Sequence, residues 1–65
     1  MANTYTYLMI NGTTMKGAVE GTFICEKYEL DAQVDFMTFY AREAGYIEFI
    51  VWLDDEEEEV YRWED

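Results

Sequence analysis

The N-terminal part of the chain has the pattern of two strands joined by a tight turn. Residues 4–10 are rich in threonine, tyrosine and β-branched side chains, and Asn11-Gly12 follows them directly. That pair is the strongest short sequence signal for a β-hairpin, because both positions tolerate the left-handed backbone of a type I′ turn. A second extended segment is expected over residues 14–28, with Gly17 and Gly21 as positions where the strand can bulge or bend.

The next segment has the three- and four-residue spacing of an amphipathic helix. We expect this helix over residues 31–44, with Asp31 as its N-cap and Asp35 near the positive end of the helix dipole. Gly45 stands where a left-handed C-terminal residue belongs. The apolar stripe that should face the sheet comprises Leu30, Val34, Met37, Tyr40, Ala41 and Ala44.

Two further strands complete the pattern. Residues 46–53 are almost all apolar, as in a well-covered strand, and residues 60–63 return as a short last strand after a run of acids. At 65 residues the chain has room for one modest core. The prediction is therefore one small α+β domain, ββαββ, in which a single helix packs on one face of a four-stranded sheet.

The pattern leaves open which face of the first strand meets the helix. If Leu8 and Ile10 point inward, the alternate side chains form an exposed patch that could bind a partner or a second copy. That patch would comprise Tyr5, Tyr7 and Met9, beside Glu48, Ile50 and Trp52. A one-residue shift in pairing exchanges the two faces and moves the same side chains into the core.

Charge distinguishes this chain from an ordinary small domain. It has 15 Asp and Glu residues against 4 Lys and Arg residues, a formal net charge of −11. Phosphate contacts need cations, so the composition excludes direct binding of nucleic acid, and an anionic membrane surface would repel the protein. Six of the acids are consecutive, between the last two strands: Asp54, Asp55, Glu56, Glu57, Glu58 and Glu59.

A solvated hairpin loop is the ordinary explanation for such an acidic run. However, a hairpin needs only about two to five turn residues, none of which must be acidic. Consecutive carboxylates repel one another without helping the turn, and they continue a charge excess that extends along the whole chain. The run is therefore interpreted as functional.

Catalytic chemistry has few candidate residues here. The chain has no histidine and no serine, and its single cysteine, Cys25, falls within an apolar strand pattern where thiols are usually inert. The acidic run lacks the spaced ligands and central glycine of a calcium loop. We expect no enzyme, no cofactor and no dedicated metal site. One cysteine cannot form an intrachain disulfide, and the first residues lack a signal-peptide pattern, which favours the cytoplasm.

Three short motifs, in order along most of the chain, resemble those of a known binding domain. They are Leu8-x-x-Asn11-Gly12-x-Thr14-x-Lys16-Gly17, Tyr40-Ala41-x-x-x-Gly45 and Asp54-Asp55. Together they resemble the immunoglobulin-binding domain of streptococcal protein G. The resemblance implies a sheet whose first and last strands pair at its centre. As an alternative function it implies a module that binds a neutral protein surface, at positions matching Val34, Asp35, Thr38, Phe39, Arg42 and Trp52.

In size, acidity and lack of catalytic residues the chain also resembles phage-encoded anti-CRISPR proteins of the DNA-mimic kind, and type I-C inhibitors most closely. Residues 54–59 and the charge balance carry that resemblance. It implies a monomer in the bacterial cytoplasm during phage infection. Its partner would be a basic nucleic-acid-binding protein: a CRISPR effector complex, bound at the subunit that reads the protospacer-adjacent motif. After the loop acids, the expected contact residues are Glu29, Asp31, Asp35 and Trp52.

Overall fold

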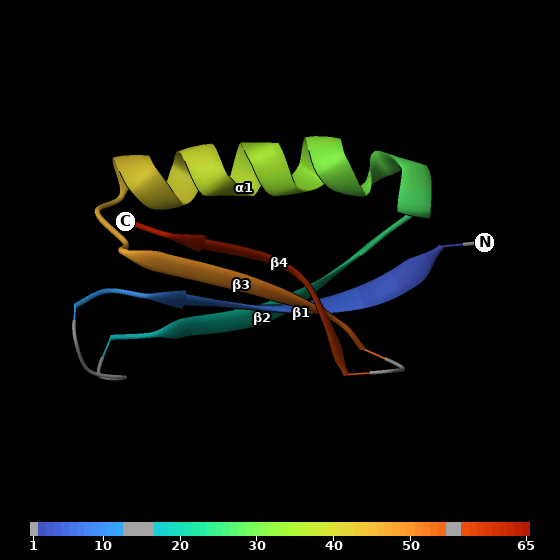
Figure 1. Cartoon of the computed structure of the whole chain (residues 1–65), viewed down its shortest axis with the longest axis horizontal. Coiled ribbons are helices and arrows are strands. Elements are labelled where there is room, and N and C mark those ends of the chain that lie inside the picture. Colours follow the sequence, from blue (N-terminus) through green and yellow to red (C-terminus); the bar gives the residue numbers. More distant parts are fainter. Residues whose placement is uncertain (1, 13–16, 55–56) are drawn as a thin grey trace.

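The order of elements along the chain confirms the predicted ββαββ domain. The structure, a computed structural model, describes residues 2–12, 17–54 and 57–65. Its elements are β1 (Asn3–Ile10), β2 (Val19–Cys25), a short 3-10 helix η1 (Lys27–Glu29), α1 (Leu30–Glu43), β3 (Glu48–Leu53) and β4 (Glu58–Glu64). Helix α1 lies across one face of the four-stranded sheet (Figure 1). No other described element covers the opposite face.

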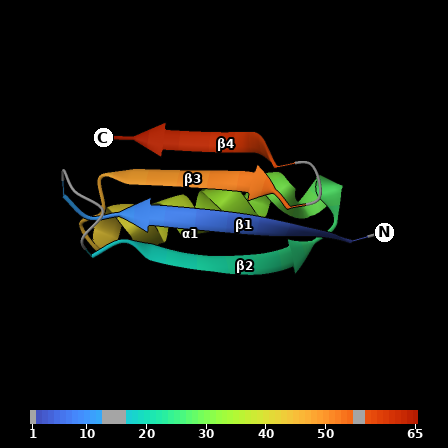
Figure 2. The same cartoon turned by 90° about the horizontal axis from the view of Figure 1, so that it is seen from below.

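The strands lie in the order β2-β1-β3-β4, and each neighbouring pair is antiparallel (Figure 2). The protein G resemblance implies that the first and last strands form the central pair, which is wrong for this chain. After α1 the chain returns directly beside β1, where the backbone N–H of Ile47 donates to the carbonyl of Ile10 at 2.9 Å. β3 therefore takes the central position, and β2 and β4 become the two edges.

The pairing of β1 with β3 decides which face of β1 meets the helix. Tyr7 is paired with Val51 and Met9 with Phe49, both of which are fully buried. Tyr5 and Met9 are themselves only 2% and 3% exposed. The exposed patch of Tyr5, Tyr7 and Met9 is therefore wrong, because these side chains point towards α1 and build the core. Their neighbours along β1 lie instead on the sheet face away from α1.

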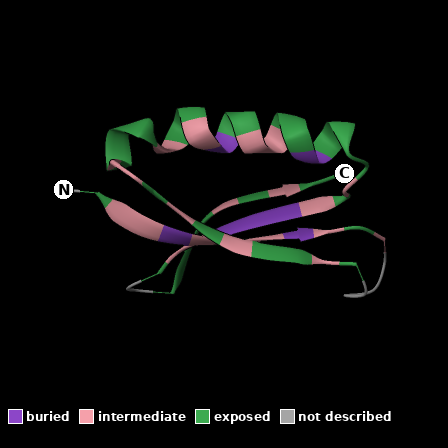
Figure 3. Ribbon diagram, turned by 180° about the vertical axis from the view of Figure 1, so that it is seen from behind, coloured by how far each residue is buried: buried purple, intermediate pink, exposed green. Residues whose placement is uncertain are grey.

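The core is a single layer between α1 and the sheet (Figure 3). Its fully packed residues are Tyr5, Met9, Val34, Ala41, Phe49 and Val51. Aromatic contacts connect neighbouring strands across it, with ring centroids 5.3 Å apart for Tyr5 and Phe23. Such pairs lie in the range where ring contacts add to simple burial. In a domain of this size a few large rings supply much of the stabilising apolar surface.

The ends of α1 differ in how well the pattern predicted them. The helix begins at Leu30 after η1 with Glu29 as its N-cap, so Asp31 is not the N-cap. A capping box of Glu26 and Glu29 lies at the start of η1. The Glu29 carboxylate accepts a hydrogen bond from the Glu26 backbone N–H at 3.0 Å. Asp31 lies exposed in the first turn, where its charge still suits the helix dipole. At the other end Gly45 has a φ of 89°, as predicted.

The predicted apolar stripe of α1 is confirmed at its centre and wrong at its margin. Val34 and Ala41 are buried, and Leu30 and Met37 pack against the core. Tyr40, in contrast, is 57% exposed. The helix is narrow relative to the sheet, so only side chains close to its centre line reach the strands.

Candidate functional site

The sheet face away from α1, which we call the open face, brings together apolar and acidic side chains from all four strands. Leu8 is paired with Ile50, Thr6 with Trp52, and Ile10 with Glu48. Ile50 is only 5% exposed, whereas Trp52 is half-buried. An apolar strip therefore follows the two central strands, and charged residues flank it on the β4 side.

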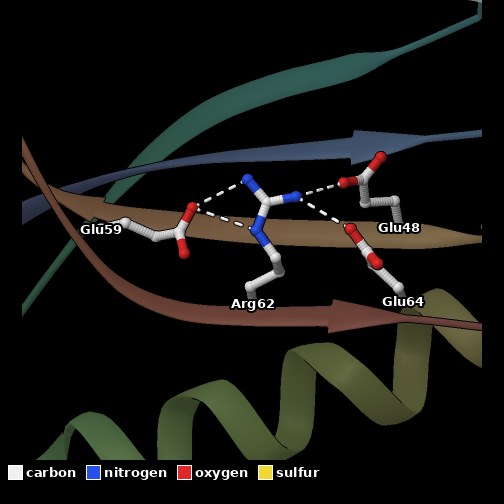
Figure 4. A network of polar contacts seen from close by, with 4 residues as sticks. All are labelled: Glu48, Glu59, Arg62 and Glu64. Carbon is white, nitrogen blue, oxygen red and sulfur yellow. Dashed lines mark hydrogen bonds and ion pairs between the residues drawn. The ribbon is translucent and has the colours of Figure 1, made fainter.

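Arg62 organises the carboxylates on that side (Figure 4). Its guanidinium donates to Glu48 at 2.6 Å, to Glu64 at 3.0 Å, and to Glu59 at 2.8 and 3.1 Å. Hydrogen bonds to Glu59 and Glu64 raise the pKa of Arg62 above its usual value. One cation faces three carboxylates, so this group, which we call the Arg62 cluster, keeps a net negative charge while its acidic side chains are held in place.

Sheet geometry explains how the cluster forms. Glu48 and Glu64 are directly opposite each other on β3 and β4, a like-charge pairing that would be unfavourable without a cation between them. A register shift between Val51 and Trp52 places Glu59 opposite Trp52, on the same face. The sequence pattern does not predict this cluster. Arg62 and Glu64 could be placed on one face from their spacing, but Glu48 joins them only through the strand pairing.

Two of the loop acids adjoin Trp52. Asp54 accepts a hydrogen bond from the Thr6 hydroxyl at 2.8 Å, and its backbone N–H donates to the Thr4 carbonyl at 3.0 Å. Asp54, Glu57, Thr6 and Trp52 line a shallow hollow of about 380 Å³. Trp52 and two acidic residues therefore line the same small space on the open face.

The other expected contact residues are distributed over both faces. Glu58 and Glu59 are exposed, but Glu58 is paired with Leu53, which packs towards the core. Asp55 and Glu56 lie outside the described residues. Glu29, Asp31 and Asp35 are exposed on the helix layer. Figure 1 places the start of α1 and the end of β3 at one end of the molecule but in separate layers. The expected residues thus form two groups, and Trp52 belongs to the open face.

The positions matched to protein G do not form one surface. Val34 is 3% exposed. The Thr38 hydroxyl donates to the Tyr61 hydroxyl at 3.1 Å, beneath the helix. Trp52 is on the sheet face opposite α1, whereas Phe39 is 65% exposed on the helix. A single partner surface cannot contact all of them.

Cys25 lies half-buried near acidic side chains. Burial raises the pKa of the Cys25 thiol, and the charges of Glu29 and Glu26 add to that rise, so little nucleophilic thiolate forms near neutral pH. Across residues 2–12, 17–54 and 57–65, no three His, Cys, Asp or Glu side chains are grouped so as to hold a metal ion. Within the same residues, no helix is long and apolar enough to cross a membrane.

Comparison of the chain with protein-family models, with curated proteins and with solved structures finds no match. A functional interpretation therefore depends on the chemistry of the chain itself.

Proposed function

We propose that this protein is an inhibitor that mimics nucleic acid, binding the basic DNA-recognition surface of a CRISPR effector complex and excluding the target DNA. The observation that carries the proposal is the open face, where fixed carboxylates flank a half-buried tryptophan. The expected contact on the effector is the subunit that reads the protospacer-adjacent motif.

Carboxylates can replace phosphates because lysine and arginine bind both through charge-assisted hydrogen bonds. Asp54, Glu57 and Glu59 are exposed beside Trp52 or directly across from it. Charge of one sign steers a basic partner and aligns it, but charge alone adds limited affinity. Trp52 supplies an aromatic surface that a partner can desolvate, which is typical of residues that dominate binding energy.

The Arg62 cluster supports the same function by preorganisation. Ordering a flexible side chain on binding costs roughly 0.5–1.5 kcal/mol. Glu48, Glu59 and Glu64 are already held by one guanidinium, so part of that ordering precedes binding. A basic partner then meets a pattern of negative charge that is set by the sheet.

One observation favours the alternative, a module that binds a protein partner without a nucleic-acid-binding surface. Phe39 is 65% exposed on the outer face of α1, at a position matched to the binding helix of protein G. Binding there would depend on apolar contact, so its affinity should hardly change with salt. Affinity of a mimic should fall as salt rises, because ions screen the attraction between opposite charges.

A competition assay tests the proposal. A purified type I-C effector complex holds labelled target duplex while the protein is titrated at low and at physiological salt. We expect displacement near stoichiometry that weakens with salt. The double variant Asp54→Lys, Glu57→Lys, at the two acids that line the hollow with Trp52, should lose displacement. It spares Glu59, which holds Arg62.

The matched control makes the same change of charge on the helix layer, with Asp31→Lys and Asp35→Lys. Displacement should persist in this control, because these residues lie away from the open face. If the loop variant still displaces duplex, the mimic mechanism is wrong. If both variants fail equally, net charge alone is responsible and the open face has no special role.

A further inference from the structure

The two edges of the sheet differ in how well they are protected against pairing with another strand. β4 carries Glu58, Glu59, Arg62 and Glu64, and its pairing with β3 contains a register shift. Charges and bulges are the devices that keep an exposed edge unpaired. β2 has one charged residue, Glu20, among the seven of its length, and no register shift interrupts its pairing with β1. β2 is therefore the edge that is open to strand addition.

An apolar surface lies directly beside that edge. A groove of about 440 Å³ runs between α1 and β2, lined mainly by apolar and aromatic side chains that include Phe23, Phe36 and Tyr40. Phe36 is 70% exposed and Tyr40 is 57% exposed, so both rings project beyond the core. Ile24, 70% exposed, lies on the other face of β2, away from this groove. Exposed apolar groups gathered beside an unprotected edge indicate an interface.

We infer that β2 pairs with β2 of a second copy of this chain, forming a two-fold symmetric dimer in which the two sheets become continuous. Full antiparallel pairing of Val19–Cys25 with itself places the two-fold axis at Thr22. Glu20 of one copy is then opposite Ile24 of the other, so the interface sets no acid against an acid within the strand. Both helices lie on the same face of the joined sheet, and the two grooves adjoin across the axis.

The distribution of charge permits this dimer despite the net charge of −11. The Arg62 cluster and Asp54 lie on the β3–β4 side of the sheet. In the dimer the two β4 strands are seven interstrand spacings apart, about 34 Å at roughly 4.8 Å each. That separation is several times the screening length of about 8 Å at physiological ionic strength. The exposed acids of β2 and the helix layer lie nearer to the interface, and their residual repulsion makes association depend on salt; they are Glu20, Glu29, Asp31, Asp35 and Glu43.

The surface beside β2 is large enough for a small interface. More than half of the surface of Phe36 and of Tyr40 is exposed. An aromatic side chain can bury about 150–250 Å². Val19, Ile24 and a strand edge of about 23 Å add to this surface. The exposed parts of the two rings amount to roughly 190–320 Å², so the whole interface is smaller than the roughly 800 Å² per subunit of a standard one, and we expect a dimer of modest affinity. The inference does not depend on the proposed function, because it concerns the protein without its target.

Sedimentation equilibrium of the full chain over a wide concentration range tests the inference. We expect a monomer–dimer equilibrium that tightens as salt rises, since salt screens the residual repulsion between copies. This sign is opposite to that expected for binding of a basic target. A chain that stays monomeric at every concentration and salt would overturn the inference, even if it binds another protein through β2.

Two pairs of variants locate the interface. Ile24→Glu places a glutamate opposite Glu20 of the other copy, twice per dimer, and should weaken association about tenfold or more. Ile24→Lys places a lysine opposite Glu20 and should preserve or tighten association. Phe36→Ser should weaken the dimer, whereas Phe39→Ser, which removes an equally exposed ring that does not line the groove, should not. Equal effects within either pair would overturn the proposed geometry. Circular dichroism confirms that each variant is folded.

Discussion

Gly21 offers a direct test of the strand register on which the open face depends. It is paired with Tyr7 across β1 and β2, and the Tyr7 ring lies over it. A Cβ atom added at Gly21 would be 2.6 Å from the Tyr7 hydroxyl oxygen and 2.7 Å from ring carbon Cζ. The ring would have to move, although it contacts Phe23 and Phe49 with centroids 6.2 and 6.3 Å away.

The expected magnitude follows from two opposing effects. Overpacking of a close-packed site costs about 1–3 kcal/mol. Replacing a strand glycine with alanine returns about 0.5–1 kcal/mol, because glycine loses more conformational freedom on folding. Gly21→Ala should therefore destabilise the protein by about 0.5–2 kcal/mol. In a Tyr7→Leu background the ring is absent, so the same change should be neutral or stabilising. The coupling between the two sites should be about 1–3 kcal/mol.

Urea unfolding of four proteins measures this coupling: the original chain, each single variant and the double variant. Tryptophan fluorescence and far-ultraviolet circular dichroism should give coincident transitions with equal m-values. A domain of this length has a total stability of only about 3–10 kcal/mol, so the effect is a measurable fraction. Additivity within about 0.5 kcal/mol would refute the register. Tyr7 would then not lie over Gly21, and the assignment of Leu8 and Ile50 to the open face would fail.

Three further predictions test other parts of the structure. Arg62→Gln should lower the melting temperature more at low salt than at high salt, because it leaves three carboxylates without their cation. Arg42→Gln makes the same change of charge at a residue whose guanidinium carbon lies 5.9 Å from the centre of the Trp63 ring. Its effect on the melting temperature should depend less on salt. An equal salt dependence in both would contradict the role of the cluster. Gly45→Ala should lower the free energy of unfolding, measured in urea, by about 1–2 kcal/mol, because the backbone φ at this residue is 89°. Gly45→Asn should lower it less, since asparagine tolerates the left-handed region better than alanine. An alanine variant with unchanged stability would contradict the left-handed turn. The raised pKa of Cys25 means that the folded state holds the thiol proton more tightly than the unfolded state does. The protonated thiol of Cys25 therefore contributes to the free energy of unfolding below the unfolded-state thiol pKa of about 8.5. This contribution is lost as pH rises through the thiol pKa of the folded state. Cys25 should react with Ellman's reagent more slowly in the folded protein than in urea at pH 8, and equal rates would be the contrary result.

Much of the fold could be predicted because its signals are local. The helical spacing up to Ala41 and the glycine at position 45 each act over a few residues. The hairpin of β1 and β2 is present, but the predicted tight turn at Asn11-Gly12 is wrong, because Met9 pairs with Val19 and Asn11 does not have a positive φ. The N-cap of α1 is Glu29 and not the predicted Asp31, because a short 3-10 helix with its own capping box of Glu26 and Glu29 leads directly into α1, whereas aspartate is the commoner N-cap type.

The candidate site was predicted only in composition. The excess of acids and the presence of Trp52 beside residues 54–59 are plain in the sequence, and the structure places Asp54, Glu57 and Trp52 around one hollow. The separation of Asp31 and Asp35 into the helix layer could not be predicted, since it depends on how the helix crosses the sheet.

By itself the sequence determined the elements, their order along the chain and the charge, because these depend on neighbouring residues and on composition. Tertiary structure alone decided that β3 lies beside β1, that Tyr5, Tyr7 and Met9 face α1, and that β2 is an unprotected edge. The physical reason is the two-residue period of a strand: a shift of one residue in pairing exchanges its faces at little local cost. Only burial against Phe49 and Val51, which lie about forty residues further along the chain, selects one face over the other.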